Sequence, residues 1–133
     1  MTTDLWMLAY TCLFCLALTG PAFLGTLRLD GGVAWFLGNR ESPLEGPAWV
    51  GRARRAHGNL VEALAPFAAL VLTAHVSGTA NEMTALAATL FFGLRVLHAV
   101  VYIAGIRTLR SVVWTAGHLC LVMIFLQLLG SPP

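Results

Sequence analysis

Charged residues are scarce in this sequence, and lysine is missing altogether. Only 11% of its 133 residues are charged, whereas 58% are hydrophobic. A water-soluble globular domain needs more polar side chains than this to cover its surface. Nucleic-acid binding needs a basic face in water, and here the only basic side chains besides histidine are arginines beside apolar runs. The composition excludes both classes and predicts an integral membrane protein whose apolar surface is solvated by the lipid bilayer.

Apolar runs long enough to cross hydrocarbon occur four times. The predicted spans cover about residues 5–27, 53–76, 83–106 and 112–129. The first run is too long for a removable signal peptide and lacks a small-residue cleavage pattern, so we expect it to be retained. Pro21 lies near its end, where a kink is tolerable. The sequence therefore predicts an all-α, four-helix membrane bundle that forms a single domain over residues 1–133.

Residues 28–52 form the only substantial loop, and glycine and proline recur along it. Within it, residues 33–37 are apolar and either lie in the membrane interface or dip back as a short helix. Arginines occur in this loop, at the start of the second span and between the third and fourth spans, but not between the second and third. The positive-inside rule places both arginine-bearing connections in the cytoplasm. We therefore expect a multi-pass protein of the inner or cell membrane with both termini on the non-cytoplasmic side.

Polar side chains nevertheless occur inside two of the spans, at helical spacing. An ionised side chain within hydrocarbon costs about 2.5 to 3.5 kcal/mol even on a lenient scale, so it should face the protein interior. The rise of about 1.5 Å per residue puts Glu62 level with His98 and within reach of Arg95, which predicts a Glu62–Arg95 ion pair with His98 beside it. The polar residues form one stripe on each span, and the two stripes together predict one polar cavity that opens to the cytoplasm. The stripes are Arg55, Asn59 and Glu62 in the second span, and Arg95, His98 and Tyr102 in the third.

Arginine forks with asparagine and tyrosine donors suit a small ligand that bears carboxylates, and one buried carboxylate would receive an ammonium group. The simpler interpretation is that these residues only join the helices by hydrogen bonds. Because six polar residues converge at one depth, the ligand site is favoured. No metal site is expected, since the four histidines are scattered over different depths. Cys12 and Cys15 lie inside a lipid-embedded helix, where thiols are protonated and serve packing.

Two stretches of the sequence resemble a known family of membrane proteins. Residues 52–67, RARRAHGNLVEALAPF, and residues 93–114, GLRVLHAVVYIAGIRTLRSVVW, resemble the second and third spans of MAPEG proteins, the membrane-associated proteins in eicosanoid and glutathione metabolism. The patterns R-A-H-x-N-x-x-E and R-x-x-H-x-x-x-Y are specific when they occur together. The resemblance implies a homotrimer of four-helix subunits that binds glutathione between neighbouring subunits near the cytoplasmic side.

The resemblance also implies roles for individual residues. Arg110 matches the arginine that stabilises the glutathione thiolate, Ser111 follows it, and Arg28 matches an arginine that a neighbouring subunit contributes. Two positions depart from the family pattern. Gly58 stands where some members have arginine, and the connection after Tyr102 is one residue shorter, so Arg107 competes with Arg110 for the thiolate. The glutathione-binding residues implied by the resemblance are Arg28, Arg55, Asn59, Glu62, Arg95, His98, Tyr102 and Arg107, and the catalytic ones are Arg110 and Ser111.

The leading hypothesis is a glutathione-dependent transferase or peroxidase that acts on lipophilic small-molecule electrophiles. A guanidinium beside a thiol favours the thiolate, which is the nucleophile. The alternative is a non-catalytic lipid-binding or scaffold protein of the same fold, because the family includes such members. A third hypothesis is a small transporter in which Glu and His form a proton relay. The four short spans argue against it, because no broken helices of the kind found in transporters are expected.

Overall fold

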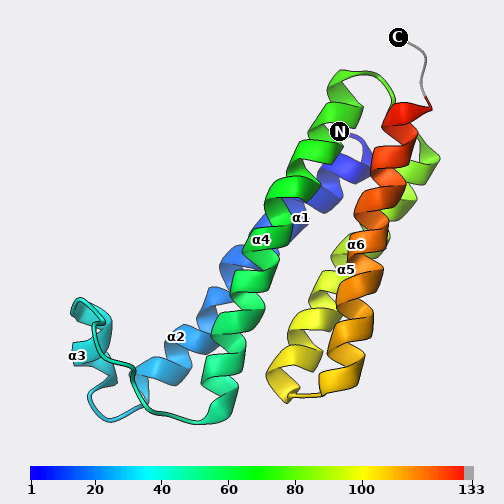
Figure 1. Ribbon diagram of the computed structural model, residues 1–133. Helices are drawn as coiled ribbons and strands as arrows, with labels where there is room; N and C mark the ends of the chain where they lie inside the picture. Colours follow the sequence, from blue (N-terminus) through cyan, green and yellow to red (C-terminus); the bar gives the residue numbers. More distant parts are fainter. Residues whose placement is uncertain (131–133) are drawn as a thin grey trace.

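All regular structure in the computed structural model, which describes residues 1–130, is helical (Figure 1). In chain order the helices are α1 (Thr3–Ala17), α2 (Thr19–Leu27), α3 (Gly32–Leu37), α4 (Ala48–Val76), α5 (Glu82–Ala104) and α6 (Arg107–Leu129). Four stretches are long and apolar enough to cross a membrane, namely α1 continued by α2, α4, α5 and α6. The predicted all-α membrane fold is thus confirmed, and the chain is an integral multi-pass protein. The last three residues of the predicted 1–133 domain lie outside the described part.

The first membrane stretch is interrupted near its middle, where α1 ends at Ala17 and α2 begins at Thr19. Pro21 has no amide N–H, so it cannot donate to the carbonyl of Ala17 four residues earlier. The amide of Leu18, the residue between the two helices, still donates to the carbonyl of Phe14 at 2.9 Å. The two helices therefore continue in nearly the same direction, as Figure 1 shows, and the proline produces a local break without ending the span.

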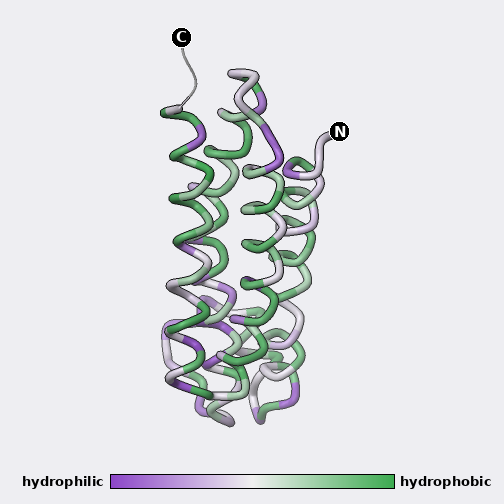
Figure 2. Tube along the Cα trace, turned by 90° about the vertical axis from the view of Figure 1, so that its right-hand side faces the viewer, coloured by the Kyte–Doolittle hydropathy of each residue, from purple (hydrophilic) through white to green (hydrophobic). Residues whose placement is uncertain are grey.

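The spanning stretches run alongside one another with alternating direction, so the start of α1 and the end of α6 share one end of the bundle (Figure 1). The loop that contains α3 and the turn between α5 and α6 share the other end. Figure 2 shows hydrophobic residues along most of the helices and hydrophilic residues gathered toward the end that carries α3. Both arginine-bearing connections therefore lie at one end of the molecule, as the loop charges predict.

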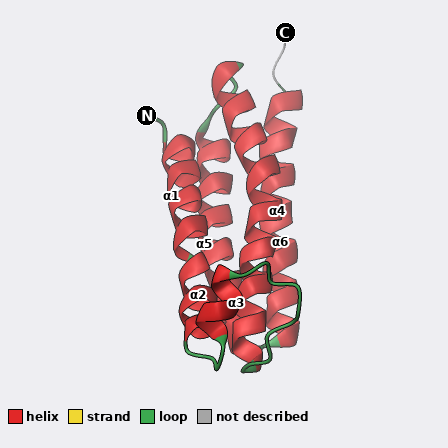
Figure 3. Cartoon of the chain, turned by 90° about the vertical axis from the view of Figure 1, so that its left-hand side faces the viewer, coloured by secondary structure: helices red, strands yellow, loops and turns green. Residues whose placement is uncertain are grey.

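The described part of the loop contains one short helix, α3, which covers the apolar residues 33–37. It lies next to α2 at the end of the bundle (Figure 3). Phe23 of α2 and Phe36 of α3 hold the two helices together, with ring centroids 4.9 Å apart in an edge-to-face arrangement. Helix α3 is thereby fixed against the bundle, and the loop forms one wall of a cavity described below.

Helix α4 is the longest element, with 29 residues. It begins at Ala48, whereas the predicted span begins at Ala53. At about 1.5 Å per residue, α4 exceeds the hydrocarbon thickness of about 30 Å. Its first turns, which carry Arg52, Arg54 and Arg55, therefore have room to extend beyond the hydrocarbon.

The core where α4, α5 and α6 meet combines small, aliphatic and aromatic side chains. The rings of Phe67 and Phe91 stack with centroids 4.1 Å apart, and Ile124 packs in the same cluster. Alanine positions such as Ala63 and Ala87 let the helices approach closely. In lipid, where burial of apolar surface gives little driving force, this close van der Waals packing is what associates the helices.

A sharp turn connects α5 to α6. Gly105 closes α5 with φ of 87°, a left-handed conformation that favours glycine. Its amide donates to the carbonyl of Val101, and Arg52 Nε donates to the carbonyl of Ile103 at 2.8 Å. The first turns of α4 are thereby tied to the end of α5. This tie sets the position at which α6 begins and hence where its first residues point.

Candidate functional site

A polar cavity of about 390 Å³ lies between α4, α5 and α6, toward the end of the bundle that carries the arginines. We call it the Arg110 cavity. Helix α4 contributes one lining residue, α5 contributes two, and α6 contributes the remaining four. The lining residues are Asn59, His98, Tyr102, Arg110, Ser111, Trp114 and Thr115. Both predicted polar stripes therefore reach one cavity, although not every residue of each stripe does.

Arg110 is held at the cavity wall by an aromatic face. Its guanidinium carbon lies 4.6 Å from the centroid of the Tyr102 ring, which is within the range of a cation–π interaction. Tyr102 is itself buried and meets the His98 ring edge-on, with centroids 5.4 Å apart. The three side chains thus form a continuous row along the cavity, with the permanent cation at one end.

The start of α6 decides which arginine reaches the cavity. The amide of Arg110 donates to the carbonyl of Ile106 at 3.1 Å, which closes the first turn of the helix. Arg107 is exposed and does not line the cavity, whereas Arg110, three residues later, is half-buried and does. The next residue, Ser111, lines the cavity as well, and its hydroxyl lies 3.4 Å from the carbonyl of Arg107.

Arg95 contacts residues of α5 and α6 and not the predicted partner Glu62. The Arg95 side chain is 2% exposed and its guanidinium carbon lies 4.9 Å from the Phe91 ring centroid. Its Nη2 lies 3.4 Å from His118 Nδ1, but that nitrogen is only 2.9 Å from the carbonyl of Trp114. A ring nitrogen that donates its proton to a carbonyl cannot also accept, so we take the shorter contact as the hydrogen bond. Residues 1–130 also provide no hydrogen-bond partner for Nε and Nη1 of Arg95.

The predicted Glu62–Arg95 ion pair is therefore wrong for the single chain, because residues 1–130 form no such pair. The physical reason lies in Gly117 of α6, which has no side chain. A Cβ at this position would lie 3.1 Å from Arg95 Nη2, so the glycine leaves the notch that the guanidinium fills. Glu62 is exposed on α4. Pro66 also withholds the amide that would bond to the carbonyl of Glu62, so α4 presents extra acceptor capacity at this turn.

The cavity chemistry matches a ligand with negative charge. An arginine fork, an asparagine amide and three hydroxyl-bearing side chains supply donors, and no carboxylate occurs among the described residues of the wall. Trp114 adds apolar surface on one side. A volume of about 390 Å³ falls in the range of small-molecule sites. The site can thus bind a small, polar and anionic ligand beside a permanent cation.

A family comparison decides the assignment of this chain. A model of the MAPEG family matches residues 5–130, which is nearly the whole sequence. The chain belongs to the MAPEG family. Neither the curated proteins nor the solved structures contain a match to it. The resemblance of residues 52–67 and 93–114 to this family is therefore confirmed, and members of the family use glutathione.

Half of the residues that the resemblance assigns line the Arg110 cavity of this MAPEG protein. They are Asn59, His98, Tyr102, Arg110 and Ser111. The others lie elsewhere on the single chain. Arg28 and Glu62 are exposed, and so is Arg107. Arg55 is exposed too and borders a separate hollow beside Gly51, while Arg95 is buried against α6.

Sequence reasoning missed part of the α6 side of the cavity in this MAPEG protein, since of the four lining residues on that helix it assigned only Arg110 and Ser111. Trp114 and Thr115 line the Arg110 cavity, and His118 contacts Arg95 one turn further on. Together with Ser111, these residues occur at i, i+3, i+4 and i+7, so they share one helical face. That spacing is the signal that would have found them, since a stripe of hydroxyl and ring nitrogen groups along the fourth span parallels the stripes of the second and third.

The cysteines and histidines form no metal site within residues 1–130, where no group of three or more potential ligands gathers. All three cysteines are free in the described chain. Cys15 is buried, and its sulfur lies 3.8 Å from His57 Nε2. Cys12 is exposed. The two thiols of Cys12 and Cys15 therefore lie in different surroundings.

Proposed function

We propose that this MAPEG protein is a membrane-embedded glutathione transferase or peroxidase that binds glutathione in the Arg110 cavity. The observation that carries the proposal is the position of Arg110, held over the Tyr102 ring at the wall of a polar cavity. A guanidinium beside a thiol favours the thiolate over the neutral thiol. Arg110 would stabilise the sulfur anion, and the Ser111 hydroxyl would turn from the carbonyl of Arg107 to donate a hydrogen bond to the sulfur.

The remaining wall would bind and orient the tripeptide. Glutathione has two carboxylates and one ammonium group, and the donors of Asn59 and Tyr102 suit its carboxylates and amides. Trp114 provides apolar surface at the edge of the cavity, where a lipophilic electrophile would approach from the bilayer. The nucleophilic sulfur then forms a bond to the electrophilic atom, and the leaving group departs with the bonding electron pair.

We further propose that the functional form is a homotrimer. Two charged side chains support the association of subunits, because each lacks a partner of opposite charge within residues 1–130. Arg95 is buried without a carboxylate beside it, and Glu62 is an exposed carboxylate partway along a membrane-spanning helix. An ionised group left in hydrocarbon costs about 2.5 to 3.5 kcal/mol on the lenient insertion scale. A neighbouring subunit and bound glutathione would cover the Glu62 face and could bring the exposed Arg28 toward a site.

The proposal includes an orientation in which the arginine-bearing end faces the cytoplasm and both termini lie on the opposite side. Five of the arginines belong to the first loop and the start of α4, and two to the α5–α6 turn and the start of α6. The positive-inside rule supports this arrangement. The Arg110 cavity would then be accessible to glutathione from the cytoplasm and to its apolar substrate from the lipid.

Calorimetry with glutathione on the detergent-purified full chain tests the proposal. We expect binding at millimolar concentration or below, together with an ultraviolet thiolate absorbance on binding. Arg110→Ala should abolish that absorbance, whereas Arg107→Ala is the matched control and should retain it, because Arg107 is exposed outside the cavity. Absence of binding at millimolar glutathione would reject the proposal. Binding without thiolate or turnover would support the non-catalytic alternative instead.

A further inference from the structure

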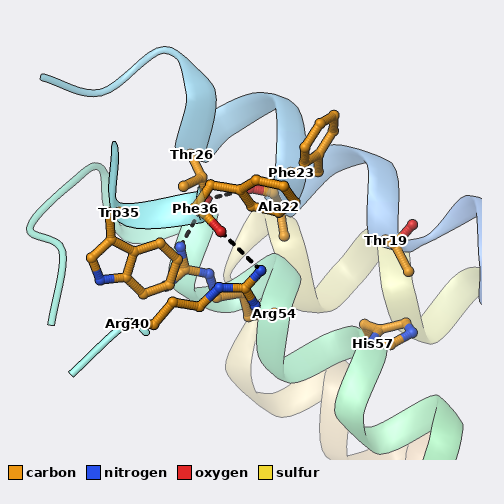
Figure 4. Close-up of a pocket in the computed structure, with 9 residues that line it drawn as sticks. All are labelled: Thr19, Ala22, Phe23, Thr26, Trp35, Phe36, Arg40, Arg54 and His57. Carbon is orange, nitrogen blue, oxygen red and sulfur yellow. Dashed lines mark hydrogen bonds between the residues drawn. The ribbon is translucent and has the colours of Figure 1, made fainter. Parts of the chain in front are cut away.

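A second cavity of about 390 Å³ lies on the α2 side of α4 (Figure 4). We call it the Trp35 cavity. It is formed by α2, by α3 with the residue stretch that follows, and by α4. The lining residues are Thr19, Ala22, Phe23, Thr26, Trp35, Phe36, Arg40, Arg54 and His57. None of them lines the Arg110 cavity, so this is a separate site on the same chain.

Arg54 is held in this cavity by contacts on two sides. Its Nη2 donates to Thr26 Oγ1 at 2.7 Å, and that hydroxyl donates in turn to the carbonyl of Ala22 at 2.7 Å. Thr26 is only 2% exposed, so the acceptor does not move freely. The guanidinium carbon of Arg54 also lies 4.6 Å from the Trp35 ring centroid. Nη2 of the Arg54 guanidinium is thereby fixed, while the N–H groups on its other nitrogens remain available.

Arg40 approaches the same indole ring from the loop. Its guanidinium carbon lies 5.5 Å from the Trp35 centroid and 4.8 Å from the Phe36 centroid. Its Nη2 lies 3.4 Å from the carbonyl of Phe36. The backbone of Arg40 has φ of 58°, and it is the one non-glycine residue of the described chain with a positive φ. A strained backbone of this kind persists only where surrounding contacts compensate for it.

The charge of the Trp35 cavity is unbalanced. Two permanent cations share one aromatic ring, and no aspartate or glutamate is among the residues that line the cavity. The neighbouring carboxylate of Glu41 contacts the Asn39 amide at 3.5 Å. Two cations at close range repel one another, and an anion that lies between them offsets this repulsion. The wall therefore holds two arginine forks in position for an anion that residues 1–130 do not supply.

We propose that the Trp35 cavity binds an oxyanion, with its phosphate or carboxylate group between Arg40 and Arg54. Arginine forks match the geometry of both head groups. Phe23 lies across the cavity from the arginines and is 39% exposed, and the next residue, Leu24, is 53% exposed. Where the oxyanion is the head group of a lipid, the hydrocarbon chain would leave along this apolar face of α2. The cavity also lies at the arginine-rich end of the bundle, where lipid head groups are found.

The ligand can come from two sources that share this chemistry. An acidic phospholipid of the bilayer would place its phosphate in the cavity and its acyl chains along α2. A free phosphate-bearing metabolite would use the same arginines without the apolar face. Native mass spectrometry of the full-length, detergent-purified protein distinguishes them with three probes, which are dihexanoyl phosphatidic acid, dihexanoyl phosphatidylcholine and inorganic phosphate.

We expect phosphatidic acid to bind at least about tenfold more tightly than phosphatidylcholine, because charge-assisted hydrogen bonds to arginine need an accessible anionic head group. Arg54→Gln and Arg40→Gln should each weaken binding of phosphatidic acid by about tenfold. Arg107→Gln removes the same charge outside the cavity and should change it by less than about twofold. Competition by inorganic phosphate would identify a free oxyanion as the ligand, and its failure to compete would identify the lipid.

Two results would overturn the proposal. One is equal weakening by Arg107→Gln, which would mean that only net charge matters. The other is equal affinity for phosphatidic acid and phosphatidylcholine. Arg40→Gln keeps the experiment decisive if Arg54→Gln fails to fold, because Arg40 is exposed in the loop and its contacts are with the rings of Trp35 and Phe36 and a nearby carbonyl, whereas Arg54 lies on α4. Glutathione binding should be unchanged in both variants, so the outcome is independent of the function proposed for the Arg110 cavity.

Discussion

The guanidinium carbon of Arg110 lies 4.6 Å from the centre of the Tyr102 ring, across the turn that joins α5 to α6. Tyr102 is 9% exposed, so its ring is fixed by the packing of α5. A flexible arginine near a membrane surface would normally sample many orientations. Here the aromatic face restricts the cation to one wall of the cavity, where it can act on a bound thiol.

This relationship predicts different outcomes for two substitutions of Tyr102. Tyr102→Phe keeps the aromatic face and should retain most of the glutathione thiolate absorbance. Tyr102→Leu removes the cation–π contact, which contributes about 0.5 to 2 kcal/mol, and should lower the thiolate fraction by roughly fivefold. Ultraviolet difference spectra of the glutathione complex measure both. If the two variants lose the signal equally, the hydroxyl and not the ring is the group that matters.

Glu62 provides a test of whether the exposed face of α4 is covered. If glutathione or a second subunit contacts this carboxylate, Glu62→Gln should weaken glutathione binding by about tenfold, the loss expected for a charge-assisted hydrogen bond. Glu82→Gln, an exposed glutamate at the start of α5, is the matched control and should leave the affinity unchanged. Unchanged affinity in Glu62→Gln, together with a more stable protein, would mean that the carboxylate faces lipid.

Gly117 is predicted to be sensitive to the smallest substitution. A Cβ there would lie 3.1 to 3.4 Å from three atoms of the Arg95 guanidinium group, so Arg95 or α6 must shift. Gly117→Ala should lower the free energy of unfolding by about 1 to 3 kcal/mol, the usual cost of overpacking. Gly93→Ala is the control, because a Cβ at Gly93 meets nothing within 4 Å. Thermal unfolding in detergent compares the two variants. Equal melting temperatures would contradict the conclusion that the Arg95 guanidinium fills the space beside Gly117.

The start of α5 offers a test at the opposite end of the bundle. Asn81 Oδ1 accepts from the amides of Met83 and Thr84, and its Nδ2 donates to Gln127 of α6 at 3.1 Å. Asn81→Ala should destabilise the protein by about 1 kcal/mol through loss of the helix cap. Asn81→Asp retains the capping oxygen and should recover most of that loss. A deficit in Asn81→Asp as large as in Asn81→Ala would assign the effect to the contact with Gln127.

The sequence predicted the spans because uninterrupted apolar runs leave few alternatives in a chain with so few charges. It also predicted Asn59, His98 and Tyr102 at one cavity, since helical spacing alone places such residues on common faces. The Glu62–Arg95 pair failed because depth along a helix does not determine rotation about its axis. The missing side chain at Gly117 redirected Arg95, and a single glycine in a small-residue helix gives no clear sign of this effect.

The Trp35 cavity could not be predicted for a different reason. It depends on the loop between α2 and α4, where Arg40 adopts a left-handed backbone that no periodic pattern indicates. Its contacts also join residues far apart in the chain, as in the hydrogen bond from Arg54 to Thr26. Loop conformations of this kind are set by tertiary contacts and not by local sequence preference.

The length of α4 links the protein to the thickness of its membrane. With 29 residues, α4 is longer than α5 and α6, which have 23 each. A thicker bilayer would draw the first turns of α4 toward the acyl region, and a thinner one would release them to water. Arg54 and Arg55 lie on those turns, so the hydration of the arginine-rich end should vary with acyl-chain length. The lipid composition of the host membrane thus becomes a physical variable that adjusts how these cations meet their ligands.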